Sequence, residues 1–413
     1  MRNILVMLTG TSLAQLLSIL ISPLLTRIYS PDTFGLFANF LAVHAIIGSV
    51  AALRYEIAIM LPRSQKRALN VMLLACGITL GVALLAAIVF MLGNSIIANL
   101  VDKPEMEPWL FWLPLSIAAM GLYQTFSYWH NRQRCFALLA QNRFWQSLTT
   151  SASQLILALL GLRLGLLWGY LFGLMASTVF LASDIAKNQW RNFRYVQRRT
   201  LHLMARQYVR FPLYDVPSVL LGVGANQIPS ILFSVMFSPA VAGVFYLTQR
   251  VLQAPITLIS SSVVEVFKEH AAHEYRTLGH ARSAFRKTLL LLIMVSLPPA
   301  IVLYFLIVPL FGWVFGSQWT SAGVYAQIML PALFIRFVAS PLSFMFYIAE
   351  RQRLNLMGMA VLAFGTWGMF HVYDSPETIL RGINWLYFVV YFSYLAISAK
   401  LAGYFHGPRS TRP

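Results

Sequence analysis

Apolar stretches of about 20 residues, the length of a helix that crosses a bilayer, recur from one end of this 413-residue chain to the other. Only short polar segments separate them. The composition agrees, because 58% of the residues are hydrophobic and 11% are charged, whereas about a quarter of the residues of a soluble domain are charged. The sequence therefore predicts an all-α, polytopic membrane protein with no soluble domain.

The apolar windows and the polar breaks between them predict about twelve transmembrane spans. They lie near residues 4–28, 34–60, 68–93, 109–130, 144–161, 165–186, 212–236, 244–267, 288–311, 322–349, 355–371 and 382–404. With a cytoplasmic N-terminus, most Lys and Arg residues of the loops fall inside, and only Lys103, Arg163 and Arg381 fall outside. We therefore expect both termini in the cytoplasm. The net charge of +18 is then mainly a signal of topology, and no nucleic-acid partner is expected.

Two loop segments are similar in sequence. Tyr29–Phe37 joins the first and second spans, and Phe237–Phe245 joins the seventh and eighth. In both, a Ser-Pro pair begins a turn and a Gly ends it. Short turns also recur by chance, but an internal duplication would give two six-helix lobes around a central cavity. The lobes would be residues 1–186 and 211–413, joined by a basic cytoplasmic linker at 187–210.

Further segments carry a family resemblance. They are Gly10–Gln15, Ser22–Gly35 and Leu53–Pro62 in the first half, and Arg210–Pro217, Ile228–Pro229 and Gly243–Pro255 in the second. In these segments the chain resembles the polysaccharide-biosynthesis flippases. These are the Wzx-type O-antigen and exopolysaccharide exporters of the multidrug/oligosaccharidyl-lipid/polysaccharide (MOP) superfamily. The twelve predicted spans fit this branch better than the similar lipid II flippases, which usually have two more.

The resemblance implies a transporter of the bacterial inner membrane and not an enzyme. Its expected substrate is a polyprenyl-pyrophosphate-linked oligosaccharide, the repeat unit of an O-antigen of lipopolysaccharide or of an exopolysaccharide. This lipid would be flipped from the cytoplasmic to the periplasmic leaflet by alternating access. Membrane lipids and other polysaccharide-assembly proteins are the expected partners. The linker 187–210 would lie on anionic lipid, and it could also gather pyrophosphate-bearing lipid.

Three arginines within the predicted spans are candidates for binding the head group: Arg54, Arg250 and Arg336. An ionisable side chain inside a bilayer costs about 2.5–3.5 kcal/mol on insertion scales, so it usually faces a wet cavity or a partner. A pyrophosphate enters a low-dielectric core only with cations or water, and Arg offers phosphate oxygens an always-charged fork. The resemblance assigns a cationic lumen to the family. For Arg336, near the middle of span 322–349, the alternative is an ion pair with Glu56 or Asp215 that locks the bundle.

Three carboxylates, those of Glu56, Asp215 and Glu265, are candidates for ion coupling. A carboxylate between arginines can exchange such a partner for a proton as the cavity opens and closes. Structural pairing is the alternative. His44 lies alone on an apolar span, which favours a hydrogen-bonded packing residue over a proton carrier.

Helix-distorting residues gather in the seventh span. Pro212, Pro217 and Pro229 bend it and free backbone carbonyls, and the polar pair Asn226 and Gln227 beside Pro229 could line the cavity. In the neighbouring sixth span, Gly161, Gly165, Gly169 and Gly173 follow one another every four residues, which predicts a close-packing ridge.

Enzyme classes find no support in the sequence. There is no P-loop, no HExxH motif and no metal-ligand cluster, so no cofactor or metal is expected. A membrane-embedded polysaccharide polymerase or ligase is one alternative, but the longest predicted outside loops, 94–108 and 372–381, are short for a catalytic segment. A multidrug exporter of the same superfamily is the other, and only the local motifs speak against it.

Overall fold

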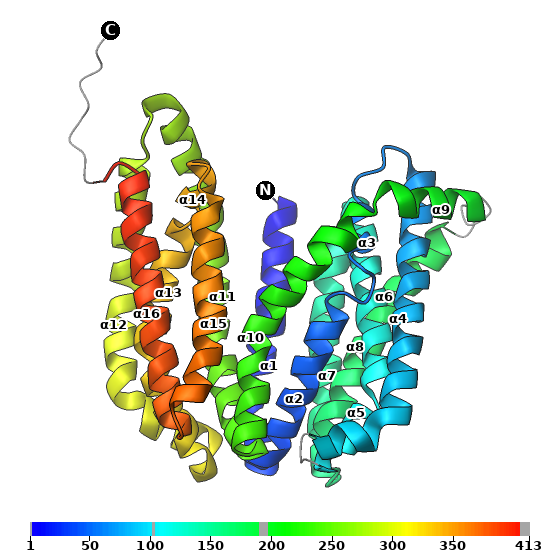
Figure 1. Ribbon diagram of the computed structural model, residues 1–413, viewed down its shortest axis with the longest axis horizontal. Helices are drawn as coiled ribbons and strands as arrows, with labels where there is room; N and C mark the ends of the chain where they lie inside the picture. Colours follow the sequence, from blue (N-terminus) through cyan, green and yellow to red (C-terminus); the bar gives the residue numbers. More distant parts are fainter. Residues whose placement is uncertain (1, 101–103, 190–196, 405–413) are drawn as a thin grey trace. The chain divides into compact units, whose positions relative to one another are not determined.

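The fold is built from helices. The computed structural model describes residues 2–100, 104–189 and 197–404, and the side chains of all of these except 2–12, 94–100, 104, 198, 254–255, 257–262, 265 and 352. Twelve helices of at least 18 residues occur in these ranges, which contain no strand (Figure 1). They are α1 (Arg2–Ile28), α2 (Pro31–Gly48), α4 (Gln65–Leu100), α6 (Leu113–Arg132), α7 (Phe136–Leu159), α8 (Gly165–Gln189), α10 (Val216–Met236), α11 (Pro239–Leu278), α12 (Arg282–Phe315), α13 (Thr320–Leu342), α15 (Gln352–Val372) and α16 (Pro376–Leu401).

Each predicted span overlaps one of these long helices, so their number and order are confirmed. Six helical segments of the described ranges are, by length and hydropathy alone, suited to cross a membrane: Gln65–Gly93, Gly165–Gln189, Phe211–Met236, Arg282–Phe315, Ser317–Ile348 and Pro376–Leu401. Short helices connect the long ones: α3 (Tyr55–Ala58), α5 (Glu107–Leu110), α9 (Arg198–Gln207) and α14 (Met345–Ile348).

α11 and α12 extend beyond the predicted spans 244–267 and 288–311. The polar residues at their facing ends stay helical because a side chain caps the turn between them. The Glu274 carboxylate accepts hydrogen bonds from the backbone N–H of Ser283 (2.8 Å) and of Ala284 (2.7 Å), and so satisfies two donors at the start of α12. Gly279, with φ of 72°, ends α11.

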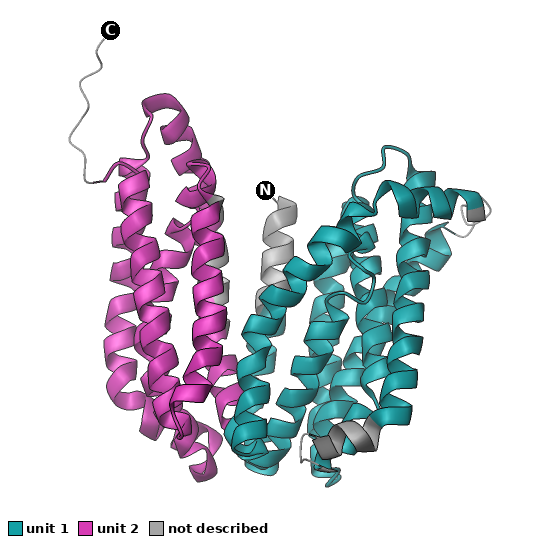
Figure 2. Cartoon of the chain, viewed as in Figure 1, with its two compact units in different colours: residues 1–243 teal, residues 244–413 magenta. Residues whose placement is uncertain are grey.

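The chain divides into two compact units, Met1–Gly243 (unit 1) and Val244–Pro413 (unit 2), coloured separately in Figure 2. The boundary between the units lies within α11, after Gly243, and α10 packs on α2 within unit 1. A buried hydrogen bond joins these helices, from Asn39 Nδ2 to Ser234 Oγ at 2.6 Å. The division into six-helix transport lobes stays a prediction, and residues 190–196 of the predicted linker lie outside the described residues.

The two similar loop segments have the same local structure. Ser30 precedes α2 and its Oγ accepts the backbone N–H of Thr33 at 3.4 Å, while Ser238 precedes α11 and accepts that of Val241 at 3.3 Å. In each case Pro is the first residue of the helix, where its missing N–H costs nothing. This equivalence supports the predicted internal duplication.

The glycine ridge packs α8 against α7, as predicted. A Cβ on Gly169 would collide with Gln154, and one on Gly173 with Thr150, both on α7. Gly161 does not belong to this ridge, because it lies in the turn before α8 with φ of 72° and has open space where a Cβ would be. The turn needs its backbone freedom, and the four-residue spacing there is accidental.

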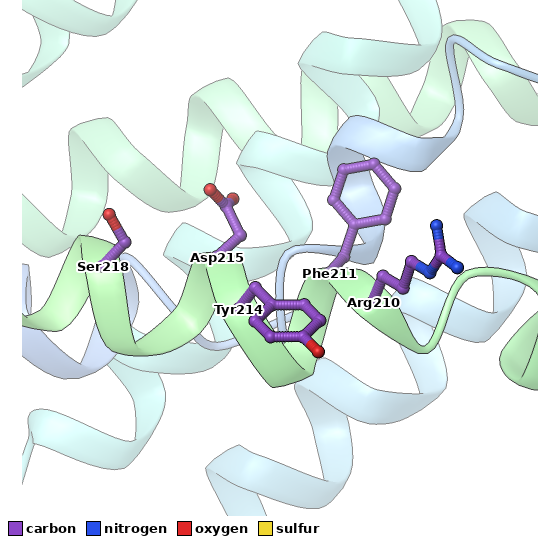
Figure 3. A pocket seen from close by; sticks show the side chains of 5 residues that line it. All are labelled: Arg210, Phe211, Tyr214, Asp215 and Ser218. Atoms are coloured by element: carbon purple, nitrogen blue, oxygen red, sulfur yellow. The ribbon is translucent and has the colours of Figure 1, made fainter. Parts of the chain in front are cut away.

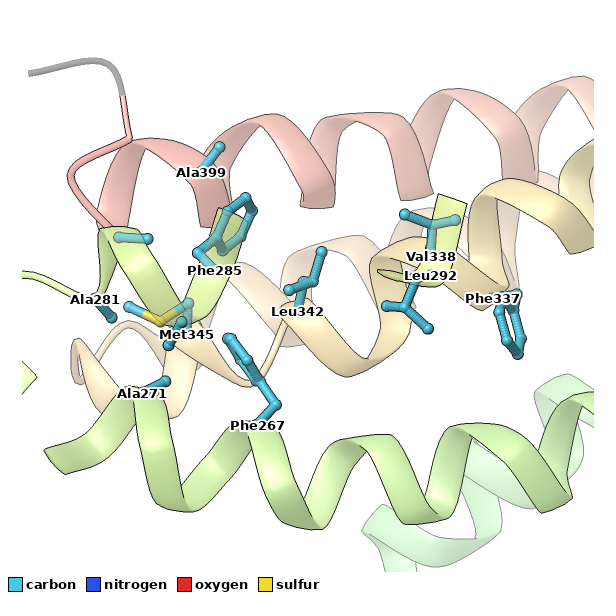
Figure 4. Packing of buried hydrophobic residues seen from close by; sticks show 12 residues of the cluster. Phe267, Ala271, Ala281, Phe285, Leu292, Phe337, Val338, Leu342, Met345 and Ala399 are labelled. Carbon is cyan, nitrogen blue, oxygen red and sulfur yellow. The ribbon is translucent and has the colours of Figure 1, made fainter. Parts of the chain in front are cut away.

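Unit 2 has an apolar core between α11, α12, α13 and α16. Phe267 of α11, Phe285 and Leu292 of α12, and Leu342 of α13 are at most 1% exposed and pack together (Figure 4). Phe337 and Val338, which follow Arg336 in α13, belong to the same core.

Candidate functional site

The second predicted span, 34–60, is not one continuous helix. α2 ends at Gly48, residues 49–54 form a series of turns, and the short α3 follows. Leu53 and Arg54 have positive φ angles of 48° and 64°, a conformation that is uncommon for residues other than Gly. Such backbone strain costs of order 1–3 kcal/mol and tends to occur at functional sites. Broken helices also form the binding sites of many transporters.

The break brings three charged side chains together, and we call Arg54, Glu56 and Asp215 the Arg54 cluster. Arg54 Nη1 lies 3.2 Å from Glu56 Oε1, and Arg54 Nε lies 2.7 Å from Asp215 Oδ2. Residues two apart do not face each other on a helix, so Arg54 can pair with Glu56 only because the helix is interrupted. Glu56 and Asp215, two of the carboxylates predicted for ion coupling, are therefore both paired with Arg54.

The members of the Arg54 cluster differ in their access to solvent. The side chain of Glu56 is 1% exposed, that of Arg54 is 19% exposed and that of Asp215 is 37% exposed. Glu56 Oε2 is buried and has no hydrogen-bond partner among the described residues. A buried carboxylate oxygen without a partner is costly when the group is charged, so the charge of Glu56 depends on Arg54.

Asp215 belongs to a π-helical turn, Phe211–Asp215, directly before α10. π-Helical turns are rare in proteins, and many of those that occur lie at functional sites. Beside it lies a pocket of about 350 Å³ lined by Arg210, Phe211, Tyr214, Asp215 and Ser218. Phe211, Asp215 and Ser218 project from one side of the helix in Figure 3. The pocket therefore combines a guanidinium, two hydroxyl groups and an edge of the Arg54 cluster.

Arg336 of α13 is half-buried in unit 2, and its guanidinium carbon lies 5.8 Å from the centre of the Tyr391 ring of α16. Among the described residues of unit 2 no carboxylate lies within 4 Å of it. Glu56 and Asp215, the carboxylates considered as its structural partners, belong to unit 1 and contact Arg54 there. A contact with an aromatic face partly stabilises the cation but does not neutralise it.

The other predicted site residues are less distinctive. Arg250 is half-buried on α11. Asn226 of α10 is exposed and donates to its own helix, at the Gly222 carbonyl (2.8 Å), and Gln227 beside it is half-buried. Neither lines the pocket of Figure 3. The side chain of Glu265 lies outside the described residues.

His44 is a packing residue, as the sequence favoured. Its Nδ1 lies 2.9 Å from Ser116 Oγ and its Nε2 lies 2.8 Å from Tyr170 Oη, and only 2% of the residue is exposed. With both ring nitrogens engaged, it joins α2 to α6 and α8.

Several residues of the site were not expected from the sequence. Tyr391 carries no local signal, since it lies 55 positions from Arg336. Arg210 and Ser218 flank Asp215, and Arg210 lies within the resemblance segment Arg210–Pro217, which is the signal that could have found it. Arg132 of α6 fastens the loop after α3 by donating to the carbonyls of Ile59 and Met60, both at 3.0 Å.

Residues 24–323 match the family model described as Polysaccharide biosynthesis protein, which is well over half of the chain. The chain belongs to this family. No protein with curated annotation matches it. This polysaccharide biosynthesis protein is similar in fold to solved structures of transporters. Over 94% of its length it superposes on the lipid II flippase MurJ in an inward closed conformation, covering 87% of that chain with a TM-score of 0.74 at 13% identity.

A second similar structure is an inward-facing multidrug resistance MATE family transporter of the MOP superfamily. The TM-score is 0.70 at 13% identity, and 94% of this chain and 95% of that one are covered. A MATE transporter from Vibrio cholerae gives 0.58 at 14% identity, with 97% and 95% covered. The polysaccharide biosynthesis protein thus has the fold of the MOP superfamily, with about twelve transmembrane helices. Family and fold confirm the resemblance seen in the sequence and agree with a transporter rather than an enzyme.

Proposed function

We propose that this protein flips a polyprenyl-pyrophosphate-linked oligosaccharide, an O-antigen or exopolysaccharide repeat unit, from the cytoplasmic to the periplasmic leaflet of the bacterial inner membrane. The observation that carries this proposal is Arg336, a half-buried cation on a transmembrane helix with no carboxylate within 4 Å among the described residues of unit 2. Holding an uncompensated charge there costs free energy unless an anion or water reaches it. A head group with about two negative charges is such an anion, and a guanidinium binds its oxygens through two parallel hydrogen bonds.

Arg54 is proposed as a second, switchable cation. Its charge is held by Glu56 and Asp215, so a pyrophosphate reaching it has to displace a carboxylate. Asp215 is the replaceable partner because it is 37% exposed and lines the pocket with Arg210 and Ser218. Displacement would couple the arrival of the head group to a change at the start of α10. Arg250, Asn226 and Gln227 are assigned to the same cavity by the sequence argument alone.

Ion coupling is proposed at the carboxylates of Glu56, Asp215 and Glu265. Protonation of Glu56 would remove the charge that Arg54 holds in place, and its unpartnered Oε2 offers a position for the proton. An empty cavity lined by arginines resists reorientation, and such a proton changes that balance. Alternating access would then be driven by an ion gradient and not by nucleotide hydrolysis.

The orientation of the chain is part of the proposal. The distribution of Lys and Arg supports an orientation with both termini in the cytoplasm, and this orientation would put the Arg54 cluster near the cytoplasmic ends of α2 and α10. The substrate would enter there from the leaflet in which it is assembled. Other polysaccharide-assembly proteins would use it on the periplasmic side.

The test is a flipping assay in proteoliposomes. A fluorescent polyprenyl-pyrophosphate oligosaccharide is included in the bilayer, and the fraction accessible to a membrane-impermeant quencher is followed with time. The proposal expects protein-dependent flipping of this lipid and no uptake of a cationic dye. Uptake of the dye without flipping would instead identify a multidrug exporter. Extension of the oligosaccharide, or its transfer to an acceptor lipid, would identify a polymerase or ligase.

A further inference from the structure

Unit 2 contains an apolar pocket of about 400 Å³ between α11, α12 and α13. Every described side chain that lines it is apolar except that of Ser296, whose hydroxyl donates to its own helix at the Leu292 carbonyl (2.6 Å). Leu252 of α11, Leu303 of α12 and Leu333 of α13 are among the lining residues. The described lining therefore offers no free polar group to hold water or a sugar, and the volume of the pocket is within the range of ligand sites.

The pocket is open along one side of α12. Val295 and Leu310 line it and are 48% and 41% exposed, whereas Ile307 and Phe311 form its buried floor. From Val295 to Leu310 the helix rises about 22 Å, which is most of the hydrocarbon thickness of a bilayer. We call this pocket the groove; its lining extends along most of that thickness, which suits one extended hydrocarbon chain.

Two prolines lie in the part of α12 that lines the groove. Pro298 and Pro299 lie within α12, and Pro299 lines the pocket. A proline inside a helix removes a backbone hydrogen bond, and its compact ring leaves more space beside the helix than a long side chain would. The small side chain of Ala300 in the next position lines the pocket as well.

α13 joins this groove to the proposed head-group site. Leu333, Phe334 and Phe337 line the groove, and Arg336 lies between them on the neighbouring face of the same helix. The ring of Phe337 points toward α11 (Figure 4). One helix thus presents a cation and an apolar wall within a single turn. A ligand that satisfies both has an anionic head and a hydrocarbon chain.

We propose that the groove between α11, α12 and α13 binds the isoprenoid tail of the transported lipid while the head group is held at Arg336. This inference rests on the proposed function for the identity of the ligand. During transport, part of the tail would then contact the protein and not the lipid bilayer. If each heavy atom occupies about 30 Å³, the volume of a water molecule in the liquid, the groove holds about a dozen heavy atoms, or two to three isoprene units.

The experiment is photoaffinity labelling of the full-length protein in proteoliposomes. The probe is a polyprenyl phosphate with a diazirine on its isoprenoid chain, and a phosphatidylethanolamine with a diazirine on an acyl chain is the comparison. We expect the prenyl probe to label residues 251–256, 295–311 or 330–337, and unlabelled polyprenyl phosphate to reduce this labelling at least fivefold. Equal labelling by the phospholipid probe, or labelling that polyprenyl phosphate does not reduce, would show an ordinary lipid-facing surface and overturn the inference.

Ala300→Trp fills the groove, and Ile301→Trp is its matched control, because Ile301 is the adjacent residue of α12, is 51% exposed and does not line the pocket. Ala300→Trp is expected to lower prenyl labelling at least fivefold, and Ile301→Trp to leave it unchanged. If Ala300→Trp does not fold, Ala300→Leu fills part of the groove and should reduce labelling two- to threefold. Unchanged labelling in a folded Ala300 variant contradicts the proposal.

Labelling does not require flipping, so the two proposals fail separately. If unlabelled polyprenyl phosphate reduces the labelling but the protein does not flip the oligosaccharide lipid, the tail site is supported and the proposed function is contradicted. If folded Ala300→Trp protein flips normally but its groove is not labelled by the prenyl probe, the proposed function is supported and the tail site is contradicted.

Discussion

Gly35 of α2 and Gly243 of α11 lie at reciprocal positions where these two helices begin. A Cβ on Gly35 would overlap the carbonyl oxygen of Pro239, and a Cβ on Gly243 would overlap that of Pro31. Each glycine thus contacts the proline that begins the other helix. Each also lies four positions after the proline that begins its own helix. The two similar loop segments therefore pack against each other symmetrically, as two copies of one element would.

Any side chain at these glycines is expected to be destabilising. Gly35→Ala and Gly243→Ala should each lower the free energy of unfolding by about 1–3 kcal/mol, because the obstructing atoms belong to backbone that cannot move aside. Gly77→Ala is the control, since Gly77 is an exposed residue within α4 with nothing near its Cβ position. Thermal unfolding in detergent measures the difference. Equal stability of the Gly35, Gly243 and Gly77 variants would contradict the reciprocal packing.

The Arg54 cluster is expected to be energetically coupled. Arg54→Ala leaves Glu56 buried without its cation, a change that costs about 3–5 kcal/mol for fully buried pairs and less here, because Arg54 is 19% exposed. Glu56→Gln removes the charge that Arg54 compensates, so adding it to Arg54→Ala should restore part of the stability. A double-mutant cycle measures this coupling, expected at about 0.5–3 kcal/mol. Additive effects within error would mean that the 3.2 Å contact contributes nothing.

The positions of the helices could be predicted, but the break in the second span could not. The predicted span 165–186 and α8 (Gly165–Gln189) agree because the thickness of the bilayer sets the number of apolar residues that a spanning helix needs. Residues 49–54 contain neither Gly nor Pro, and the Gly48–Ser49 pair where α2 ends is a weak signal within a long apolar run. Arg54, at the end of the interruption, donates a hydrogen bond to Asp215, which lies 161 positions away in the sequence. Contacts between distant residues also placed Tyr391 under Arg336, which explains why the sequence could name that cation but not its surroundings.

Helix C-terminal turns allow a test of backbone strain away from the site. Arg134 follows α6 with φ of 59° and is exposed, and Gly161 follows α7 with φ of 72°. Arg134→Gly should raise the free energy of unfolding by a few tenths to about 1 kcal/mol, since Gly adopts this conformation without steric cost. Gly161→Ala should lower it by a similar amount, although its Cβ would meet no atom. Opposite signs are expected in denaturant or thermal unfolding, and a stabilising Gly161→Ala would be inconsistent with this conformation.

Arg336 is expected to be required for transport and not for folding. Arg336→Ala should reduce flipping of the lipid-linked oligosaccharide at least tenfold, because the head group loses its cation, while the amount of protein in the membrane stays normal. Arg336→Lys should recover part of the rate, since a point charge remains although the planar fork is lost. Arg381→Ala is the control, as Arg381 is an exposed arginine of α16 in a predicted outside segment. Normal flipping by Arg336→Ala would remove this residue from the head-group site.

The coupling prediction concerns the return of the empty carrier. Outward movement of a doubly charged head group is favoured by an inside-negative potential, but the cavity with its arginines must then reorient without an anion. A membrane potential supplies about 2.3 kcal/mol per charge per 100 mV, enough to shift a two-state equilibrium about fifty-fold.

Proteoliposomes with the fluorescent substrate can be given a potential or a pH gradient separately, and we expect at least one of them to change the flipping rate. Glu56→Gln, Asp215→Asn and Glu265→Gln should weaken that response, whereas Asp374→Asn, at an exposed loop carboxylate, should keep it. A rate that ignores both gradients, in the parent and in the carboxylate variants alike, would mean that the carboxylates are structural. The protein would then equilibrate its substrate passively, and the pairing of Arg54 with Glu56 and Asp215 would serve only to hold the interrupted helix against α10.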